Sequence, residues 1–230
     1  MVKKHSRARK TIGTVLVYAL LVVITVITVY PIVQIFGISL RPANQLYSTS
    51  LSIIPEGASF EAYRAVLFEK DFLTWLRNSA IVAVAVSVFG VTLASTSGYA
   101  FSRFSFRGRK AGMISILVTQ MFPATMLLLP LYIIMSKFQL INTLLGIIIA
   151  YTATALPFCI WTMKGYYDTI PVDLEEAAMI DGTTRFGAFV KVTLPLSAPA
   201  LVITALFSFM AGWSEFIVAR VIINSKGLYT

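Results

Sequence analysis

The 230-residue chain carries little charge and few of the side chains that bind metals or form disulfides. Charged residues make up 13% of the sequence, against about a quarter in a soluble domain, and 57% of the residues are hydrophobic. The single cysteine, Cys159, excludes an intrachain disulfide, and the single histidine, His5, excludes a histidine-based metal cluster. The composition therefore predicts a polytopic membrane protein without a metal site.

Nucleotide-binding motifs are also missing. The chain contains no G-x-x-x-x-G-K-[ST] loop and not even one Gly-Lys pair, and no cluster of His, Asp or Ser indicates a membrane enzyme. A net charge of +9 could indicate nucleic-acid binding, but in a membrane protein it indicates Lys and Arg residues that set topology. We therefore expect a non-enzymatic chain with no cofactor of its own and no nucleic-acid partner.

Long uncharged runs divide the chain into predicted membrane spans. The run from Thr11 to Leu40 has no charge over 30 residues, which is too long for a signal peptide and long enough for a tilted span. The tail before it, MVKKHSRARK, carries five basic residues and no acid, so we place the N-terminus in the cytoplasm. The predicted spans are residues 12–38, 76–102, 111–135, 143–163 and 196–223.

The distribution of charge between the spans predicts their orientation. Residues 103–110 carry four basic residues and no acid, whereas residues 41–77 carry four of each, so we place the first segment inside and the second outside. The same count places residues 165–195 in the cytoplasm and the C-terminus outside. Residues 224–230 read like the start of another external loop, so we expect a sixth span beyond them; a genuine five-span protein is the alternative.

The segment 171–195 is the only long polar interruption in the second half of the chain. Asp173 is predicted to be the N-cap of a short helix, and Glu176, three residues later, completes a capping box. Gly182 is predicted at the C′ position, where a left-handed backbone conformation costs glycine little. The segment therefore begins with a short helix that is capped at both ends.

A second short helix is predicted to follow. Thr183 or Thr184 can cap it, it continues through Lys191, and Pro195 permits a new helix to start beyond it. Two capped helices make a rigid protrusion of the kind that fits a groove in a soluble partner. Three apolar side chains are predicted to supply its contact area: Phe186, Phe189 and Val190.

The letters from Glu176 to Pro195 read E-A-A-x3-G-x9-V-x-L-P. This pattern resembles the EAA signature of the membrane subunits of bacterial ABC importers, in which the position of Val192 is most often Ile. Five other stretches resemble the sugar-transporting branch, and the likeness is closest to the smaller permease subunit of maltose/maltodextrin importers. They are ISLRP at 38–42, YAFSRFSFRG at 99–108, TQMFP at 119–123, WTMKGYYDTIP at 161–171 and GWSEF at 212–216.

The resemblance implies an all-α polytopic membrane protein, in which residues 1–230 form one MetI-like permease bundle with a cytoplasmic coupling helix element. It implies half of a pathway for maltose, maltodextrin or a related oligosaccharide across the bacterial inner membrane. The implied partners are a second homologous permease, a dimer of ATP-binding subunits that holds the ATP and Mg²⁺, and an extracytoplasmic sugar-binding protein. The residues implied to dock on the ATPase are Asp173, Glu175, Glu176, Ala177, Ala178, Gly182, Phe186, Leu194 and Pro195.

Three side chains within the predicted spans are candidates for the translocation pathway: Gln120, Trp213 and Glu215. An acid inside a span is costly, so Glu215 should face the bundle interior, water or a partner. It is either a pathway or gating residue, or a structural hydrogen-bonding group. The alternative to an ATP-driven importer is a self-sufficient secondary carrier, which predicts inverted repeats, and the sequence shows no convincing internal repeat.

Overall fold

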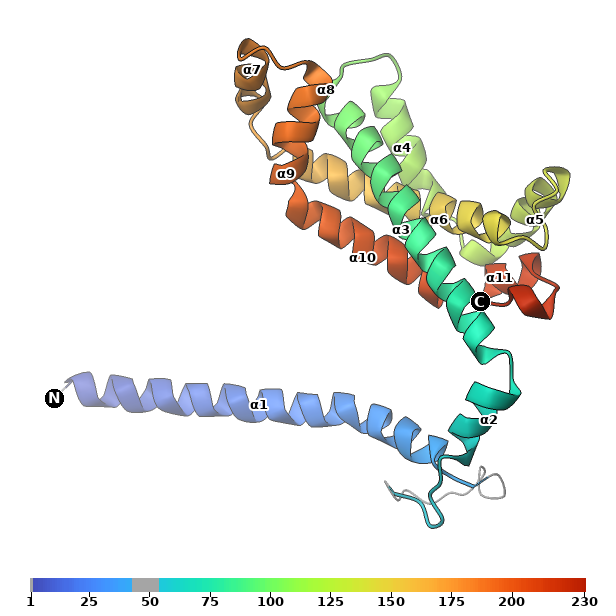
Figure 1. The fold of residues 1–230 in the computed structure, drawn as a ribbon. Coiled ribbons are helices and arrows are strands. Elements are labelled where there is room, and N and C mark those ends of the chain that lie inside the picture. Colours follow the sequence, from blue (N-terminus) through green and yellow to red (C-terminus); the bar gives the residue numbers. More distant parts are fainter. Residues whose placement is uncertain (1, 43–53) are drawn as a thin grey trace. The chain divides into compact units, whose positions relative to one another are not determined.

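The computed structural model describes residues 2–42 and 54–230. These residues form helices joined by turns, with no strand among them, so the predicted all-α class is confirmed (Figure 1). The chain divides into two compact units, Met1–Phe72 and Leu73–Thr230.

The first unit contains one long apolar helix and one short helix. α1 (Val2–Ser39) covers the predicted range 12–38, and its segment Thr11–Ser39 is long and apolar enough to cross a membrane. α2 (Glu61–Glu69) is a short helix in the segment predicted to lie outside. Part of that segment, residues 43–53, lies outside the described residues.

Three long helices form the core of the second unit: α3 (Phe72–Arg103), α6 (Leu144–Tyr167) and α10 (Ala198–Ser214). α3 covers the predicted range 76–102, and α6 begins one residue after the start of the predicted range 143–163 and continues one turn beyond its end. α10 packs mainly against α6. The buried side chains form two clusters: one lies between α3, α6, α5 (Leu128–Lys137) and α11 (Ile217–Ile222), and the other between α3, α6, the start of α10 and the segment that precedes it.

Two glycines on α3 let the other core helices approach it closely. A Cβ atom at Gly90 would lie 2.5 Å from the Ser208 hydroxyl on α10, and one at Gly98 would lie 2.9 Å from the Lys164 backbone nitrogen on α6. Both distances are too short for a real Cβ atom, so only glycine permits this packing. α3 is therefore packed tightly against α6 and α10.

The segment predicted as the third span, 111–135, is divided in the structure. α4 (Arg109–Thr119) ends before Pro123, and the chain resumes through the 3-10 turn η2 (Ala124–Leu127) and α5 (Leu128–Lys137). Proline lacks the N–H that continues a helix, and it disfavours helical backbone in the residue before it. The predicted span is therefore made of two short helices that are interrupted near Pro123.

The predicted fifth span, 196–223, is also divided. α10 ends at Ser214, Glu215 has extended backbone with ψ of 125°, and α11 (Ile217–Ile222) begins two residues later. The Glu215 carboxylate accepts a hydrogen bond from the Val218 backbone N–H at 3.0 Å, which satisfies a free donor at the start of α11. In the described residues, three helices are long and apolar enough to cross a membrane, and a fourth follows if α10 is joined to the bent helix before it.

Candidate functional site

Two short helices form a compact element at one end of the second unit. α7 (Asp173–Ile180) and α8 (Arg185–Ala188) lie near the connection between α3 and α4, whereas α5 and α11 lie at the opposite end (Figure 1). α7 packs on α8 and on the helical turn that follows it. We call residues 171–197 the α7–α8 element.

The element continues without a loop into the core of the unit. After α8 the chain passes through a π-helical turn (Phe189–Thr193) and α9 (Leu194–Leu196), so it stays helical beyond Lys191, the predicted end of the second helix. The helix axis then bends by 79°, and α10 begins at Ala198, three residues after Pro195. The element is therefore joined to α10 through continuous helix and one sharp bend.

The predicted capping box at the start of α7 is wrong. Asp173 is the first helical residue, and the N-cap is Val172, which makes no side-chain cap. Val172 has helical backbone angles of −64° and −30°, so the chain enters the helix one residue earlier than a capping Asp173 requires. The acidic side chains of Asp173 and Glu176 still lie in the first turn, where they complement the positive end of the helix dipole.

The predicted caps between α7 and α8 are confirmed. Gly182 has φ of +90°, and the Thr183 backbone N–H donates to the Ala178 carbonyl at 3.1 Å, which is the hydrogen bond of a Schellman motif. Of the two threonines, Thr184 is the cap of α8, because its hydroxyl accepts from the Gly187 N–H at 3.1 Å. The turn between the two helices is thus held at both ends by backbone and side-chain hydrogen bonds.

A buried charged cluster attaches α7 to the end of α3. The Glu175 carboxylate accepts from Arg103 Nε at 2.7 Å and from the Tyr99 hydroxyl at 2.7 Å. Arg103 also donates from Nη2 to the Ile170 carbonyl at 2.8 Å, just before the element. The Arg103 and Glu175 side chains are only 8% and 5% exposed, so this pair is sequestered from water.

This cluster corrects one prediction and adds a residue that sequence reasoning missed. Glu175 is predicted to dock on a partner, but its carboxylate is enclosed by its own chain. Burial raises the pKa of the Glu175 carboxyl, but the hydrogen bonds from Tyr99 and Arg103 outweigh burial and hold the pKa below its ordinary value. Arg103 stands out in the sequence only as one of four basic residues at the end of a span, a signal that indicates topology and not a partner.

A second ion pair lies beside the first. Lys164, in the last turn of α6, contacts Asp168 at 2.5 Å, and the Ser102 hydroxyl of α3 donates to the same carboxylate at 2.8 Å. Partial burial raises the pKa of Asp168, but the hydrogen bonds from Lys164 and Ser102 bring it below its ordinary value. The ends of α3 and α6 are therefore tied together next to the α7–α8 element.

The outer surface of the α7–α8 element carries large exposed apolar side chains among its charged ones. Ile180, at the end of α7, is 86% exposed, and Phe186, in α8, is 73% exposed. Val190 is partly exposed, but Phe189, which was expected to add contact area, is buried against Tyr99 with a ring separation of 4.4 Å. Exposed apolar side chains of this size on a rigid element are typical of a surface that binds a partner.

The other predicted docking residues lie on or near this surface. Ile180, which the sequence analysis did not select, is the most exposed large apolar side chain of the element. Its position at the end of α7, next to the C-cap, could have suggested Ile180 as a docking residue. The exposed residues among the predicted set are Asp173, Glu176, Ala177, Gly182, Phe186 and Pro195, and the partly buried ones are Ala178 and Leu194.

Comparison with known families agrees with this architecture. Residues 88–230 match the model of the family described as binding-protein-dependent transport system inner membrane component. The chain belongs to this family. It is therefore an inner-membrane component of a transport system, and its relatives confirm the predicted resemblance to the permease subunits of sugar ABC importers.

Several relatives are similar to this permease over most of its length. It is 34% identical to the maltose/maltodextrin transport system permease protein MalG of Yersinia pestis, over 100% of this chain and 80% of MalG. It is 33% identical to the galactooligosaccharides transport system permease protein GanQ of Bacillus subtilis, over 97% and 80%. A crystal structure of a bacterial ABC transporter involved in the import of the acidic polysaccharide alginate matches it with a TM-score of 0.81 and 27% identity, over 96% and 77%.

The permease does not gather the three predicted pathway residues into one cluster. Glu215 caps α11 with its side chain, and its carbonyl accepts from the Tyr151 hydroxyl at 2.9 Å, which favours the structural interpretation of this acid. Gln120 is exposed at the end of α4, and Trp213 stacks on Phe209 at 5.8 Å. No hydrogen bond or ring contact among the described residues joins the three, so their pathway role stays a prediction.

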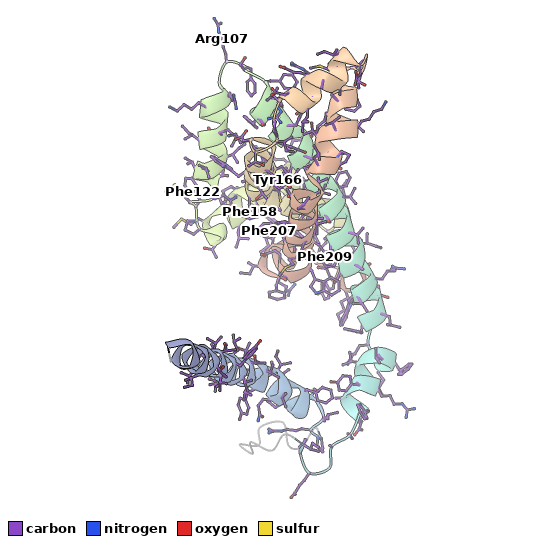
Figure 2. All side chains as sticks on the ribbon, turned by 90° about the vertical axis from the view of Figure 1, so that its left-hand side faces the viewer. Arg107, Phe122, Phe158, Tyr166, Phe207 and Phe209 are labelled. Carbon is purple, nitrogen blue, oxygen red and sulfur yellow. The ribbon has the colours of Figure 1, made fainter. Side chains whose placement is uncertain are left out.

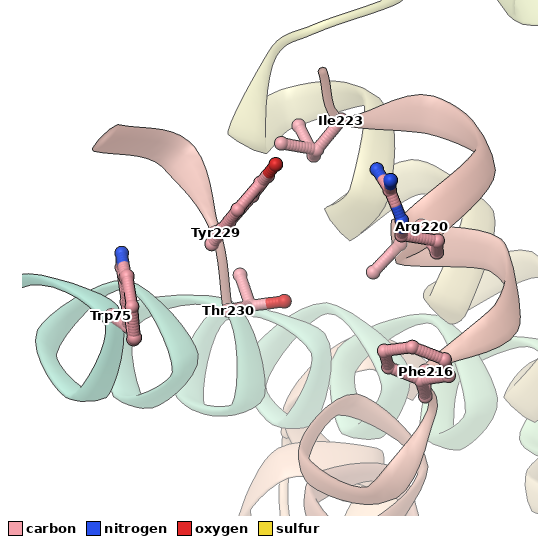
Figure 3. A pocket seen from close by; sticks show the side chains of 7 residues that line it. Trp75, Phe216, Arg220, Ile223, Tyr229 and Thr230 are labelled. Atoms are coloured by element: carbon pink, nitrogen blue, oxygen red, sulfur yellow. The ribbon is translucent and has the colours of Figure 1, made fainter. Parts of the chain in front are cut away.

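A pocket of about 340 Å³ lies at the end of the unit opposite the α7–α8 element (Figure 3). Aromatic rings from α3, from the start of α11 and from the last residues form much of its wall, and Arg220 is the charged side chain among its lining residues. The labelled lining residues are Trp75, Phe216, Arg220, Ile223, Tyr229 and Thr230.

Neutral hydrogen bonds hold the segment beside this pocket. Asn78 of α3 donates from its amide to the Gly227 and Tyr229 carbonyls at 2.9 and 3.0 Å, and the Trp75 indole N–H donates to the Lys226 carbonyl at 3.0 Å. These residues were missed because single polar or aromatic residues in an apolar run do not indicate a partner far along the sequence. The end of the unit is therefore fixed by side chains of α3.

Proposed function

We propose that this chain is a permease subunit of an ATP-driven oligosaccharide importer, and that its α7–α8 element docks on the ATP-binding subunit. The observation that carries the proposal is the exposed apolar pair, Ile180 and Phe186, on an element that the buried Glu175–Arg103 pair holds against α3. A rigid surface loses little conformational entropy on binding. The α7–α8 element then faces the cytoplasm, and the N-terminus lies on the same side.

The complete transporter would contain this chain, a second homologous permease, a dimer of ATP-binding subunits and an extracytoplasmic sugar-binding protein. ATP and Mg²⁺ would be held by the ATP-binding subunits. Closure of the ATPase dimer would displace the α7–α8 element, and the displacement would reach α10 through the helical connection and α3 through the Glu175–Arg103 pair. The permease thus couples ATP hydrolysis to alternating access.

The substrate we propose is maltose, maltodextrin or a related oligosaccharide. The relatives are named for maltose/maltodextrin and galactooligosaccharides, and a further one, 32% identical over 84% of this chain, is the diacetylchitobiose uptake system permease protein DasC of Streptomyces coelicolor. What these names share is a short neutral chain of sugar units. They therefore support oligosaccharides as the substrate class and do not single out one sugar. Uptake of labelled maltotriose, galactooligosaccharide and diacetylchitobiose by the reconstituted importer distinguishes them.

Docking is tested with the double variant Ile180→Ala/Phe186→Ala. Because both side chains are exposed, we expect membrane insertion and stability to be unchanged. Recovery of the ATP-binding subunit in a pull-down should fall at least about tenfold, which corresponds to a loss of roughly 1.4 kcal/mol of binding free energy. The control is Phe68→Ala on α2, which removes a phenylalanine that is 80% exposed on another element. Full recovery of the ATP-binding subunit and normal uptake in the double variant would contradict the proposal.

A further inference from the structure

A basic pocket lies between the ends of α4 and α6 that are next to the α7–α8 element. It has a volume of about 530 Å³, and six of its lining residues define its character: Phe106, Arg109, Lys110, Met113, Trp161 and Lys164. Three of these side chains are cations and three are apolar or aromatic. None of its lining residues belongs to the α7–α8 element, and Lys164 is the one that pairs with Asp168.

The pocket carries more positive than negative charge, because one acid, Asp168, interacts with both Lys164 and Arg109. Lys164 is paired with Asp168, whereas Arg109 and Lys110 form no ion pair among the described side chains. Arg109 donates one long hydrogen bond, 3.4 Å, to the neutral Ser102 carbonyl. Two cationic side chains are therefore available to an anionic ligand.

An apolar groove continues from the pocket along the same two helices. It has a volume of about 300 Å³ and is lined by Ile116 and Thr119 of α4 and by Leu156, Pro157 and Ile160 of α6, among others. Along α6 the distance from the cationic end of the pocket to the middle of this groove is eight residues, about 12 Å. A charged recess and an apolar groove thus lie one after the other along one crevice.

From this arrangement we infer that the α4–α6 crevice binds an anionic phospholipid of the cytoplasmic leaflet. The phosphate-bearing headgroup contacts Arg109 and Lys110, and an acyl chain lies in the groove beside Pro157. Trp161 belongs at the depth of the headgroups, where tryptophan is enriched in membrane proteins, and basic pockets between spans on the cytoplasmic side suit anionic headgroups. The inference rests on the orientation proposed above.

The apolar groove distinguishes a phospholipid from a free phosphate as the ligand of this crevice. A soluble phosphate would use the cationic pocket alone, and the apolar groove would have no part in its binding. Ala153, which is exposed and lines the groove, offers a variant that fills the groove without disturbing the core. Ala153→Leu should weaken binding of a phospholipid and leave binding of inorganic phosphate unchanged.

The experiment uses the complete importer, purified in detergent and incubated with phosphatidylglycerol or phosphatidylcholine before native mass spectrometry. We expect retention of phosphatidylglycerol in preference to phosphatidylcholine. Arg109→Gln and Lys110→Gln should each reduce the affinity for phosphatidylglycerol about fivefold, because one basic residue near an anionic lipid surface contributes about that factor. Ala153→Leu should reduce it as well.

The matched control is Arg107→Gln. Arg107 is exposed, does not line the pocket and points away from the helices at the tip of the loop between α3 and α4 (Figure 2). The substitution therefore removes the same charge as Arg109→Gln, two residues away and outside the pocket. Equal retention of both lipids, or equal loss in Arg107→Gln and Arg109→Gln, overturns the inference. A groove occupied by a partner permease overturns it too, and then Ala153→Leu disrupts permease pairing and not lipid retention. Pull-down of the ATP-binding subunit tests the proposed function separately, since none of these residues lies in the α7–α8 element.

Discussion

The two ends of α3 hold neighbouring segments by different chemistry. At one end Arg103 and Tyr99 contact the ionised side chain of Glu175, and at the other end Asn78 and Trp75 donate to backbone carbonyls of the last described turn. The first attachment needs a particular side chain on its partner and a particular charge state. The second needs only a carbonyl, which every residue supplies.

The difference corresponds to what each end has to do in the proposed transporter. A buried ion pair is costly to break, since removing one member leaves an uncompensated charge, so the α7–α8 element cannot separate from α3 without a large penalty. Neutral hydrogen bonds to the backbone are each worth much less. The end next to the α7–α8 element is thus suited to transmit displacement, and the opposite end is suited to hold a turn in place.

The largest effect is expected from Arg103→Ala. This variant leaves the Glu175 carboxylate buried without its cation, and we expect a loss of about 3–5 kcal/mol in unfolding free energy together with loss of sugar uptake. Thermal unfolding of the purified importer measures the first effect. In Arg103→Leu/Glu175→Leu both charges are gone, so stability should largely return while uptake stays low. If the double variant is as unstable as the single one, the pair does not act as the charged attachment described here.

A smaller effect is expected from Asn78→Ala at the opposite end. The substitution removes the donor to two carbonyls, Gly227 and Tyr229, and should lower the unfolding free energy by about 1–3 kcal/mol. Asn224→Ala is the control, since its side chain is exposed and only its backbone N–H takes part in the described hydrogen bonds. Equal unfolding temperatures for the two variants would show that the neutral attachment is not a distinct stabilising feature.

Trp75→Phe should have a smaller effect still. It keeps an aromatic ring next to Tyr229, 6.2 Å away, and removes only the indole N–H that donates to the Lys226 carbonyl. Because this hydrogen bond is exposed, we expect a loss at the low end of about 0.5–1.5 kcal/mol in thermal unfolding. Trp213→Phe serves for comparison, since the described residues show no hydrogen bond from its indole. A larger loss in Trp213→Phe would contradict the assignment.

Only the charged end should respond to pH, and at neutral pH the response should be absent. The pKa of Glu175 lies below its ordinary value of 4.5, so its contribution to stability is complete above that pH and is lost as the pH falls through the lower folded-state pKa. We expect the protonation of Glu175 to leave the unfolding temperature nearly unchanged between about pH 7 and 5. The unfolding temperature should then decrease at pH values below about 4.5. In Arg103→Leu/Glu175→Leu that acid-dependent step should be reduced, whereas Asn78→Ala should retain it.

The sequence by itself determined the features that depend on neighbouring residues. Long uncharged runs indicated the apolar parts of α1, α3 and α6, because burial in a bilayer requires an unbroken apolar helix. Gly182 could be recognised because a left-handed C′ position favours glycine, and Thr184 because an N-cap favours a short hydroxyl side chain. The spacing from Glu176 to Pro195 was sufficient to indicate the family.

Only the tertiary structure decided the features that depend on distant residues. Arg103 and Glu175 are 72 positions apart, and Asn78 and Tyr229 are 151 apart, so no local pattern relates them. The break at Glu215 within an apolar run was likewise not predicted, because hydropathy measures whether a segment can be buried and not whether its backbone continues as one helix. These pairs follow from how α3 packs against α7 and against residues 226–229, and packing brings together side chains whose separation along the chain carries no information.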